Sequence, residues 1–208
     1  MTRVIAGLFK GRQLLTLPGT HTRPTTDRAR EAWASSIATL REDGFVNARV
    51  LDAFAGSGAL GIEAISRGAS HATFADNDQR AIQVIIQNLR SLEIADNPQV
   101  RVIKANMLSK SFVGRLMRLG PYDCVFLDPP YAYTREDIGT VLSTLIKNNL
   151  LANGCIVSYE RHVEKPGPGE NGADPSARRW LAGLKMVSCK QYGNSAIEYY
   201  LFDQELAD

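Results

Sequence analysis

Arg49-Val50-Leu51-Asp52-Ala53-Phe54-Ala55-Gly56-Ser57-Gly58-Ala59-Leu60-Gly61 is the stretch that decides the fold of this chain. Its first half, Arg49–Ala53, is an apolar, strand-like run, and a helical pattern begins at Ala59 and extends to Arg67. The glycines between the two patterns permit a tight turn, and the helix N-terminus behind the turn presents free backbone N–H groups. A strand, a glycine loop and a helix in this order predict one unit of a parallel α/β sheet, with a nucleotide-type ligand site beside the loop.

The alternation of strand and helix continues along the chain from this stretch. It predicts a doubly wound, mostly parallel sheet with helices on both faces. Further strands are expected at residues 72–76, 100–104, 122–128 and 154–159, and further helices at residues 79–92, 109–119 and 136–148. Two last strand-like runs, Lys185–Gln191 and Ala196–Phe202, flank the turn Tyr192-Gly193-Asn194-Ser195 and predict an antiparallel C-terminal hairpin.

The N-terminal part of the chain has a different pattern. Two short strand-like runs, Arg3–Ala6 and Gln13–Leu17, flank a glycine-containing turn and predict a small β-hairpin. Arg23–Asp27 carries the signals of a helix start, and Lys165–Pro175, rich in proline, glycine and acids, predicts a flexible loop. We therefore expect two parts, a basic N-terminal hairpin extension at residues 1–25 and the main α/β domain at residues 26–208.

Charge is distributed unevenly between these two parts. The formal net charge of the chain is only +2, but residues 1–30 have a balance of +5 and the remainder a balance of −3. A basic segment on a mildly acidic body is typical of a nucleic-acid contact surface, although a solvated face without a partner remains an alternative. We expect the segment to contact RNA rather than to belong to the core, through Arg3, Lys10, Arg12, Arg23, Arg28 and Arg30.

The bulk composition fits an ordinary globular protein of 208 residues, with 44% hydrophobic and 22% charged residues. No apolar run is long enough for a transmembrane helix and no signal peptide is recognisable, so we expect a cytoplasmic protein without membrane contact. Cys124, Cys155 and Cys189 lie far apart in strand-like runs, which predicts reduced and buried thiols. The three histidines are scattered, and we expect no metal site.

Asp128-Pro129-Pro130-Tyr131 closes the strand-like run that begins at Tyr122. Proline cannot donate to a sheet ladder, so the four residues predict a rigid turn that displays a carboxylate, a free carbonyl and a flat ring. These groups suit the binding of a planar amine, usually on a nucleobase, through its N–H bonds and its face. We therefore expect all four residues to be catalytic, with Tyr131 stacking on the base; a plug at the sheet edge is the alternative for Tyr131.

The glycine loop alone fits two cofactors equally well, a dinucleotide or an adenosyl compound. Asp52 favours the second, because a carboxylate ahead of the loop suits a cationic amino-acid end and would repel a pyrophosphate. The tetrapeptide at residues 128–131 has no role in hydride transfer and also favours S-adenosylmethionine. Gly61 has an alternative role as a position of close helix–strand packing, and Asn106 as a simple loop residue. The expected cofactor-binding residues are Asp52, Phe54, Gly56, Ser57, Gly58, Asp76, Asn77, Asn106 and Met107.

With these residues identified, the chain resembles the bacterial RsmD family, which methylates the exocyclic N2 of one guanine in 16S ribosomal RNA. The resemblance runs almost end to end, and its segments are Arg3–Gly7, Lys10–Arg12, Arg23–Arg28, Arg30–Glu31, Leu51–Ala64, Asp128–Tyr131 and Tyr192–Gly193. Many amino-methyltransferases share the glycine loop and the tetrapeptide, whereas Arg23-Pro24-Thr25-Thr26-Asp27-Arg28 is specific to this family. The chain departs from the family pattern at Ala29, Trp33-Ala34, Asn106 and a long 165–175 loop.

The resemblance implies a seven-stranded, Rossmann-like class I methyltransferase fold, S-adenosylmethionine as cofactor, and small-subunit ribosomal RNA or an assembly intermediate as partner. We expect a monomer in which Asp128 and the Pro129 carbonyl hold the target amine. Two other functions remain open. An adenine-N6 DNA methyltransferase uses the same tetrapeptide but usually carries a large recognition domain, and a non-catalytic RNA-binding assembly factor would not need Gly56, Gly58 and Asp128 together.

Overall fold

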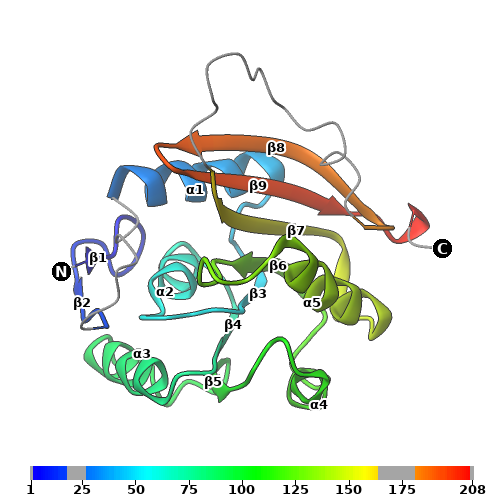
Figure 1. Cartoon of the computed structure of the whole chain (residues 1–208). Coiled ribbons are helices and arrows are strands. Elements are labelled where there is room, and N and C mark those ends of the chain that lie inside the picture. Colours follow the sequence, from blue (N-terminus) through cyan, green and yellow to red (C-terminus); the bar gives the residue numbers. More distant parts are fainter. Residues whose placement is uncertain (1, 18–26, 164–180, 207–208) are drawn as a thin grey trace.

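The computed structural model describes residues 2–17, 27–163 and 181–206 of the chain. Its centre is a seven-stranded sheet with the strand order β5-β4-β3-β6-β7-β9-β8 (Figure 1). The strands are β3 (Arg49–Asp52), β4 (His71–Asp76), β5 (Val100–Lys104), β6 (Tyr122–Leu127), β7 (Leu151–His162), β8 (Leu184–Tyr192) and β9 (Ser195–Phe202). Strands β5, β4, β3, β6 and β7 are parallel, and β9 is antiparallel to both of its neighbours, which confirms the expected C-terminal hairpin.

Both faces of the sheet are covered by helices, as the alternation of patterns predicted. The helices are α1 (Asp27–Leu40), α2 (Ala59–Ser66), α3 (Gln79–Ser91), α4 (Val113–Leu116) and α5 (Arg135–Lys147). Side chains of α1, α2 and α3 share one buried cluster with Val50 and Phe126, whereas α4 and α5 share the other with Leu51 and Val125. Neighbouring residues of one strand therefore enter different cores, because successive side chains point to opposite faces.

Two local expectations differ from the structure. The predicted helix at residues 109–119 is a short 3₁₀ turn, Lys110–Phe112, followed by the single turn of α4; Gly114, inside that run, disfavours a longer helix. Cys124 and Cys155 are buried as expected, but Cys189 is exposed, because it lies on the edge strand β8, which has a neighbouring strand on one side only. No helix in the described part of the chain is long and apolar enough to cross a membrane.

The N-terminal hairpin consists of β1 (Thr2–Arg3) and β2 (Gln13–Leu14), and it is anchored to the main domain rather than separate from it (Figure 1). Val4 and Leu14 are buried in the same cluster as α1 and α2. The buried Glu63 carboxylate of α2 accepts hydrogen bonds from the backbone N–H groups of Ile5 (2.8 Å) and Ala6 (3.0 Å). The expectation that this segment lies outside the core is therefore wrong for its apolar side chains.

The strand order determines where on the sheet a ligand site can form. The chain runs outward from β3 through β4 to β5 and then returns to β6 on the other side of β3. The loops after β3 and β6 therefore leave the sheet in opposite directions, and a crevice opens between them at the carboxyl ends of the strands. Both motifs singled out in the sequence, residues 52–58 and residues 128–131, follow these two strands.

Gly61 offers a direct test of the packing between α2 and the sheet. A Cβ atom at this position would lie 2.4 Å from Cε1 of Phe74, whose ring is fully buried. We expect Gly61→Ala to lower the free energy of unfolding by about 1–3 kcal/mol, because the core must be overpacked to admit one methyl group. Gly114→Ala is the matched control: a Cβ there meets no atom within 4 Å, so urea unfolding should show equal or greater stability. An equal effect of the two substitutions would contradict this account of Gly61.

Candidate methyl-transfer site

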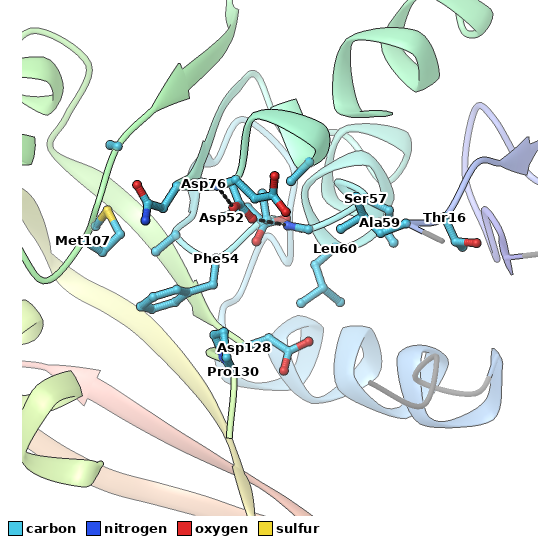
Figure 2. A pocket seen from close by; sticks show the side chains of 18 of the residues that line it. Thr16, Asp52, Phe54, Ser57, Ala59, Leu60, Asp76, Met107, Asp128 and Pro130 are labelled. Atoms are coloured by element: carbon cyan, nitrogen blue, oxygen red, sulfur yellow. Dashed lines mark hydrogen bonds between the residues drawn. The ribbon is translucent and has the colours of Figure 1, made fainter. Parts of the chain in front are cut away.

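A cavity of about 440 Å³ lies at the carboxyl ends of β3, β4, β5 and β6 (Figure 2). Of the expected cofactor-binding residues, eight line it: Asp52, Phe54, Gly56, Ser57, Asp76, Asn77, Asn106 and Met107. Asp128 and Pro130 of the tetrapeptide line it as well, across from Asp76. Two loops that are far apart in the sequence thus share one cavity.

The glycine loop has the geometry that its sequence predicts. Gly56 and Gly58 have φ angles of 54° and 80°, which are left-handed values that favour glycine. Gly58 is the N-cap of α2 and does not line the cavity. Its α-carbon packs against Phe74 and Ile85, and a Cβ added there would lie 3.3 Å from each of these side chains. The contribution of Gly58 is therefore to the turn and the packing behind the loop.

Asp76 is held in place by the backbone around it. One carboxylate oxygen accepts a hydrogen bond from Gly56 N–H and the other from Asp78 N–H, each at 2.8 Å. The side chain of Asp78 in turn caps α3 by accepting from Arg80 N–H at 2.8 Å. Each Asp76 oxygen keeps a lone pair for a further donor, so the carboxylate suits the two hydroxyl groups of a ribose.

Asp52 is a buried carboxylate, 2% exposed, that accepts one hydrogen bond from Gly61 N–H at 3.0 Å. Burial, together with the neighbouring charge of Asp76, raises the pKa of Asp52 to about 7, although the bond from Gly61 opposes the shift. Within the described ranges no cation forms an ion pair with it. A cationic ligand group in the cavity would supply the missing charge.

Apolar side chains and the amide of Asn106 form a further part of the cavity lining. Met107 is buried, and the rings of Phe54 and Tyr133 pack edge to face at 5.7 Å. Asn106 accepts from Leu108 N–H through Oδ1 at 3.0 Å, so its amide nitrogen remains as a donor toward a ring nitrogen. This combination of a flat apolar wall and one donor fits a purine ring.

The tetrapeptide is only partly within this cavity. Pro129 is buried, and Tyr131 is 56% exposed, with its ring 5.2 Å from that of His162. Asp128 is exposed toward the main cavity and also lines a smaller pocket beside Glu160. Desolvation and then the charges of Glu160 and Asp52 raise its pKa well above the ordinary value.

Several cavity residues come from the N-terminal part of the chain: Thr2, Thr16 and Leu17 were not found by sequence reasoning, and Arg30 was predicted as an RNA contact instead. Asn88, a buried polar residue of α3, holds this segment against the glycine loop. Its amide donates to the carbonyls of Leu15 (3.0 Å) and Ser57 (2.9 Å), and its Oδ1 accepts from Leu15 N–H (2.8 Å). The one signal in the sequence is an asparagine within the apolar stripe of a helix.

The predicted RNA-contact residues divide into two groups. Lys10, Arg12 and Arg28 are exposed. Arg3 is also exposed and forms an ion pair with Asp27 at 2.9 Å. Arg23 lies outside the described residues, as does the expected loop at residues 165–175. Arg30 differs: it is 2% exposed, donates to Thr2 Oγ1 at 2.6 Å and lines the cavity. A surface phosphate contact by Arg30 is therefore incompatible with its position. Among the residues that the structure describes, no group of side chains has the arrangement of a metal site.

Comparison with known proteins places the chain in a family. A family model described as conserved hypothetical protein 95 matches residues 2–201. Ribosomal RNA small subunit methyltransferase D of Escherichia coli K12 is 36% identical over 203 residues, which cover 98% of this chain and 90% of that protein. YlbH of Bacillus subtilis is 41% identical over 167 residues, covering 79% of this chain and 85% of that protein.

A solved structure, that of the Escherichia coli protein yhhF, superimposes with a TM-score of 0.74 at 32% sequence identity and covers 98% of each chain. The match therefore extends over the N-terminal hairpin as well as the sheet. The chain belongs to the conserved hypothetical protein 95 family, the RsmD-type rRNA methyltransferases that its motifs resemble.

Proposed function

We propose that this protein uses S-adenosylmethionine to methylate the exocyclic N2 amine of a guanine in 16S ribosomal RNA. The observation that carries the proposal is that Asp128, which follows β6, and the Asp52–Gly56 loop, which follows β3, line the same cavity. A methyl donor held by one loop would thus lie beside an amine held by the other. A relative that is 36% identical is named ribosomal RNA small subunit methyltransferase D, which supports the proposal.

The residues of the cavity fit this cofactor. The buried Asp52 carboxylate, which lacks an ion-pair partner in the described chain, would hold the cationic amino-acid end. The Asp76 carboxylate would accept the ribose hydroxyls, and Asn106 and Met107 would bind the edge and face of the adenine. When bound, S-adenosylmethionine supplies a methyl group on a sulfonium, which is a good leaving group. The protein therefore has mainly to position the amine.

Positioning matters because the lone pair of guanine N2 is delocalised into the ring. Hydrogen bonds from N2–H to the Asp128 carboxylate and the Pro129 carbonyl would direct that lone pair toward the methyl group. As positive charge develops on nitrogen, the same acceptors stabilise it, and Asp128, with its raised pKa, can take the departing proton. Tyr131, which is exposed beside His162, is available to stack on the base.

The proposal is tested by transfer of a labelled methyl group from S-adenosylmethionine to ribosomal RNA, to assembled small subunits and to DNA, followed by nucleoside analysis. We expect N2-methylguanosine from the RNA or the subunits and no label in DNA. Label on adenine N6 in DNA would instead identify a DNA methyltransferase. No transfer to any substrate, with the cofactor bound, would identify a non-catalytic assembly factor.

The cofactor site predicts a definite pH dependence. We expect binding of S-adenosylmethionine with a Kd on the order of micromolar, and no binding of NAD. Asp52 must be ionised to attract the cationic end, so the affinity should rise by up to about eightfold between pH 6 and 7.5, through the pKa of about 7. Calorimetry at several pH values measures this. Asp52→Asn should bind more weakly with a flat pH profile, and tight NAD binding would overturn the cofactor assignment.

The basic N-terminal hairpin predicts a salt-dependent contact with RNA. Lys10 and Arg12 are exposed near its tip, and Arg12 donates to the carbonyl of Ser91. Contacts from such side chains to phosphates release counterions, so replacing both residues with alanine should weaken RNA binding and flatten its salt slope by about one to two units. Cofactor affinity and melting temperature should remain close to those of the parent.

The control for this double variant is Arg115→Ala together with Arg118→Ala, which removes two exposed cations in and just after α4, far along the chain from the hairpin. RNA binding measured between 50 and 300 mM salt, roughly the range over which such slopes are resolved, separates the two variants. An unchanged slope in the Lys10–Arg12 variant would remove the hairpin from the RNA contact.

A further inference from the structure

Asp128 and Glu160 are neighbours at the carboxyl ends of two adjacent parallel strands. In the register of β6 and β7, Leu127 lies opposite Tyr159; Asp128 is the first residue after β6, and Glu160 is the next residue of β7. Two positions earlier, Phe126 and Ser158 both contact Trp33 of α1.

The ring centroids of Trp33 and Phe126 are 4.9 Å apart, and the indole N–H of Trp33 donates to Ser158 Oγ at 3.1 Å. Since side chains alternate along a strand, Asp128 and Glu160 extend from the same face of the sheet as Phe126 and Ser158.

These two carboxylates share a small pocket that adjoins the main cavity. Its lining residues are Trp33, Leu60, Leu127, Asp128, Ser158, Glu160 and Ile197. Asp128 and Leu60 line both spaces, so the small pocket begins where the proposed target amine would lie. Its other walls are mainly apolar, and its volume of about 10 Å³ admits no base, so only the edge of a base held in the main cavity would reach it.

Neither carboxylate is neutralised by an ion pair within the described residues. Glu160 accepts a hydrogen bond from the Ser195 side chain, which leaves further acceptor capacity on its oxygens. Desolvation raises the pKa of both carboxyls, and for Asp128 the charge of Glu160 adds to this. A ligand edge with two adjacent N–H donors would relieve the repulsion between these acceptors.

The Watson–Crick edge of guanine is such an edge, because N1–H and the N2 amine are adjacent donors. Adenine has one amine beside N1, and that N1 is an acceptor. The same tetrapeptide serves amines of both kinds, so Asp128 by itself does not distinguish the two bases. A second acceptor beside Asp128 would make the distinction, because the lone pair of an adenine N1 would face a carboxylate.

We propose that Glu160 determines the base specificity of this enzyme: its carboxylate accepts N1–H of the target guanine while Asp128 accepts N2–H. The glutamate side chain is one methylene longer than the aspartate side chain, so its carboxylate can extend to N1 of the guanine ring. This inference rests on the proposed function and names the residue that selects guanine within the site.

The test uses a synthetic rRNA fragment that contains the guanine mapped by nucleoside analysis, and a second fragment with 2-aminopurine in its place. 2-Aminopurine keeps the amine at C2, but its N1 carries no hydrogen. We expect the wild-type enzyme to prefer guanine by about a hundredfold in kcat/KM, the scale of a lost hydrogen bond to a charged group. Glu160→Gln can donate its amide N–H to N1 of 2-aminopurine, so its preference should fall below about tenfold.

The matched control is Arg161→Gln, the next residue of β7, whose guanidinium pairs with Glu198 on the opposite face. Its preference for guanine should equal that of the wild type. Calorimetry with S-adenosylmethionine shows whether each variant keeps its cofactor site. If Glu160→Gln does not fold, Glu160→Asp keeps the charge but shortens the reach, and it should lose more activity on guanine than on 2-aminopurine.

Equal losses on both substrates would overturn the proposal, because a structural or proton-accepting role of Glu160 would not change the ratio. That result leaves the proposed function intact, since guanine would still be methylated. Failure of the proposed function gives a different result, namely no N2-methylguanosine with any RNA and the wild-type enzyme.

Discussion

Asp128→Ala is expected to lower the rate of methyl transfer at least about a hundredfold, the scale on which a positioned transition-state acceptor is lost. The carboxylate lines the cavity beside the glycine loop, and desolvation together with the charge of Glu160 raises its pKa. Without it, the target amine keeps only the Pro129 carbonyl as an acceptor. Single-turnover rates with saturating cofactor and RNA measure the effect on the transfer step.

Asp128→Asn is the informative companion to this variant. Its amide oxygen can still accept a hydrogen bond from the amine, but it cannot take the proton, so the rate should lie between those of the parent and of Asp128→Ala. Cofactor affinity should change little in either variant, because the proposed contact is with the substrate. Near-normal turnover in Asp128→Ala would mean that the tetrapeptide is structural.

Glu198→Ala is expected to have the largest effect on stability. This glutamate of β9 is 1% exposed and pairs with Arg135 of α5 at 2.9 Å and with Arg161 of β7 at 2.6 Å. It also accepts from the buried Tyr200 hydroxyl at 2.5 Å. Removing it takes away the carboxylate that both guanidinium groups and this hydroxyl share, although Arg135 still donates to the Tyr200 oxygen at 2.7 Å.

Loss of one partner of a fully buried pair costs about 3–5 kcal/mol. The two arginines are 28% and 35% exposed, so water can partly solvate them, and we expect the free energy of unfolding to fall by about 2–3 kcal/mol. Urea unfolding measures this directly. Glu205→Ala removes an exposed carboxylate just after the same strand and should change stability by less than about 0.5 kcal/mol. Equal stabilities of the two variants would contradict the role of Glu198.

The ion-pair network around Glu198 is connected to the candidate site through helix α5. Arg135 is the first residue of α5, and the loop between it and β6 carries the tetrapeptide. Thr134 caps the helix in a reciprocal arrangement with Asp137, so both the start of α5 and its first side chain are fixed. We therefore expect Glu198→Ala to lower the transfer rate as well, by displacing the loop that holds Asp128.

The sequence by itself determined most of the helices and strands and most of the expected cofactor-binding residues that line the cavity. Alternating apolar runs and helical spacings are local patterns, and the strands at residues 49–52, 100–104 and 122–127 agree with them closely. The glycine loop is equally local, because the left-handed φ values at Gly56 and Gly58 favour glycine whatever the distant contacts are. Where several local preferences agree, the fold can be inferred without knowledge of distant contacts.

Only the tertiary structure decided which distant residues complete the site. Arg30 is part of a basic segment in the sequence, but packing of the hairpin buries it in the cavity wall beside Thr2. Asn88 of α3 donates hydrogen bonds to both Leu15 and Ser57 only because the tertiary fold brings these three residues together. Asp128 and Glu160 are adjacent only because β6 and β7 pair in that register, and register follows from the whole sheet rather than from either strand.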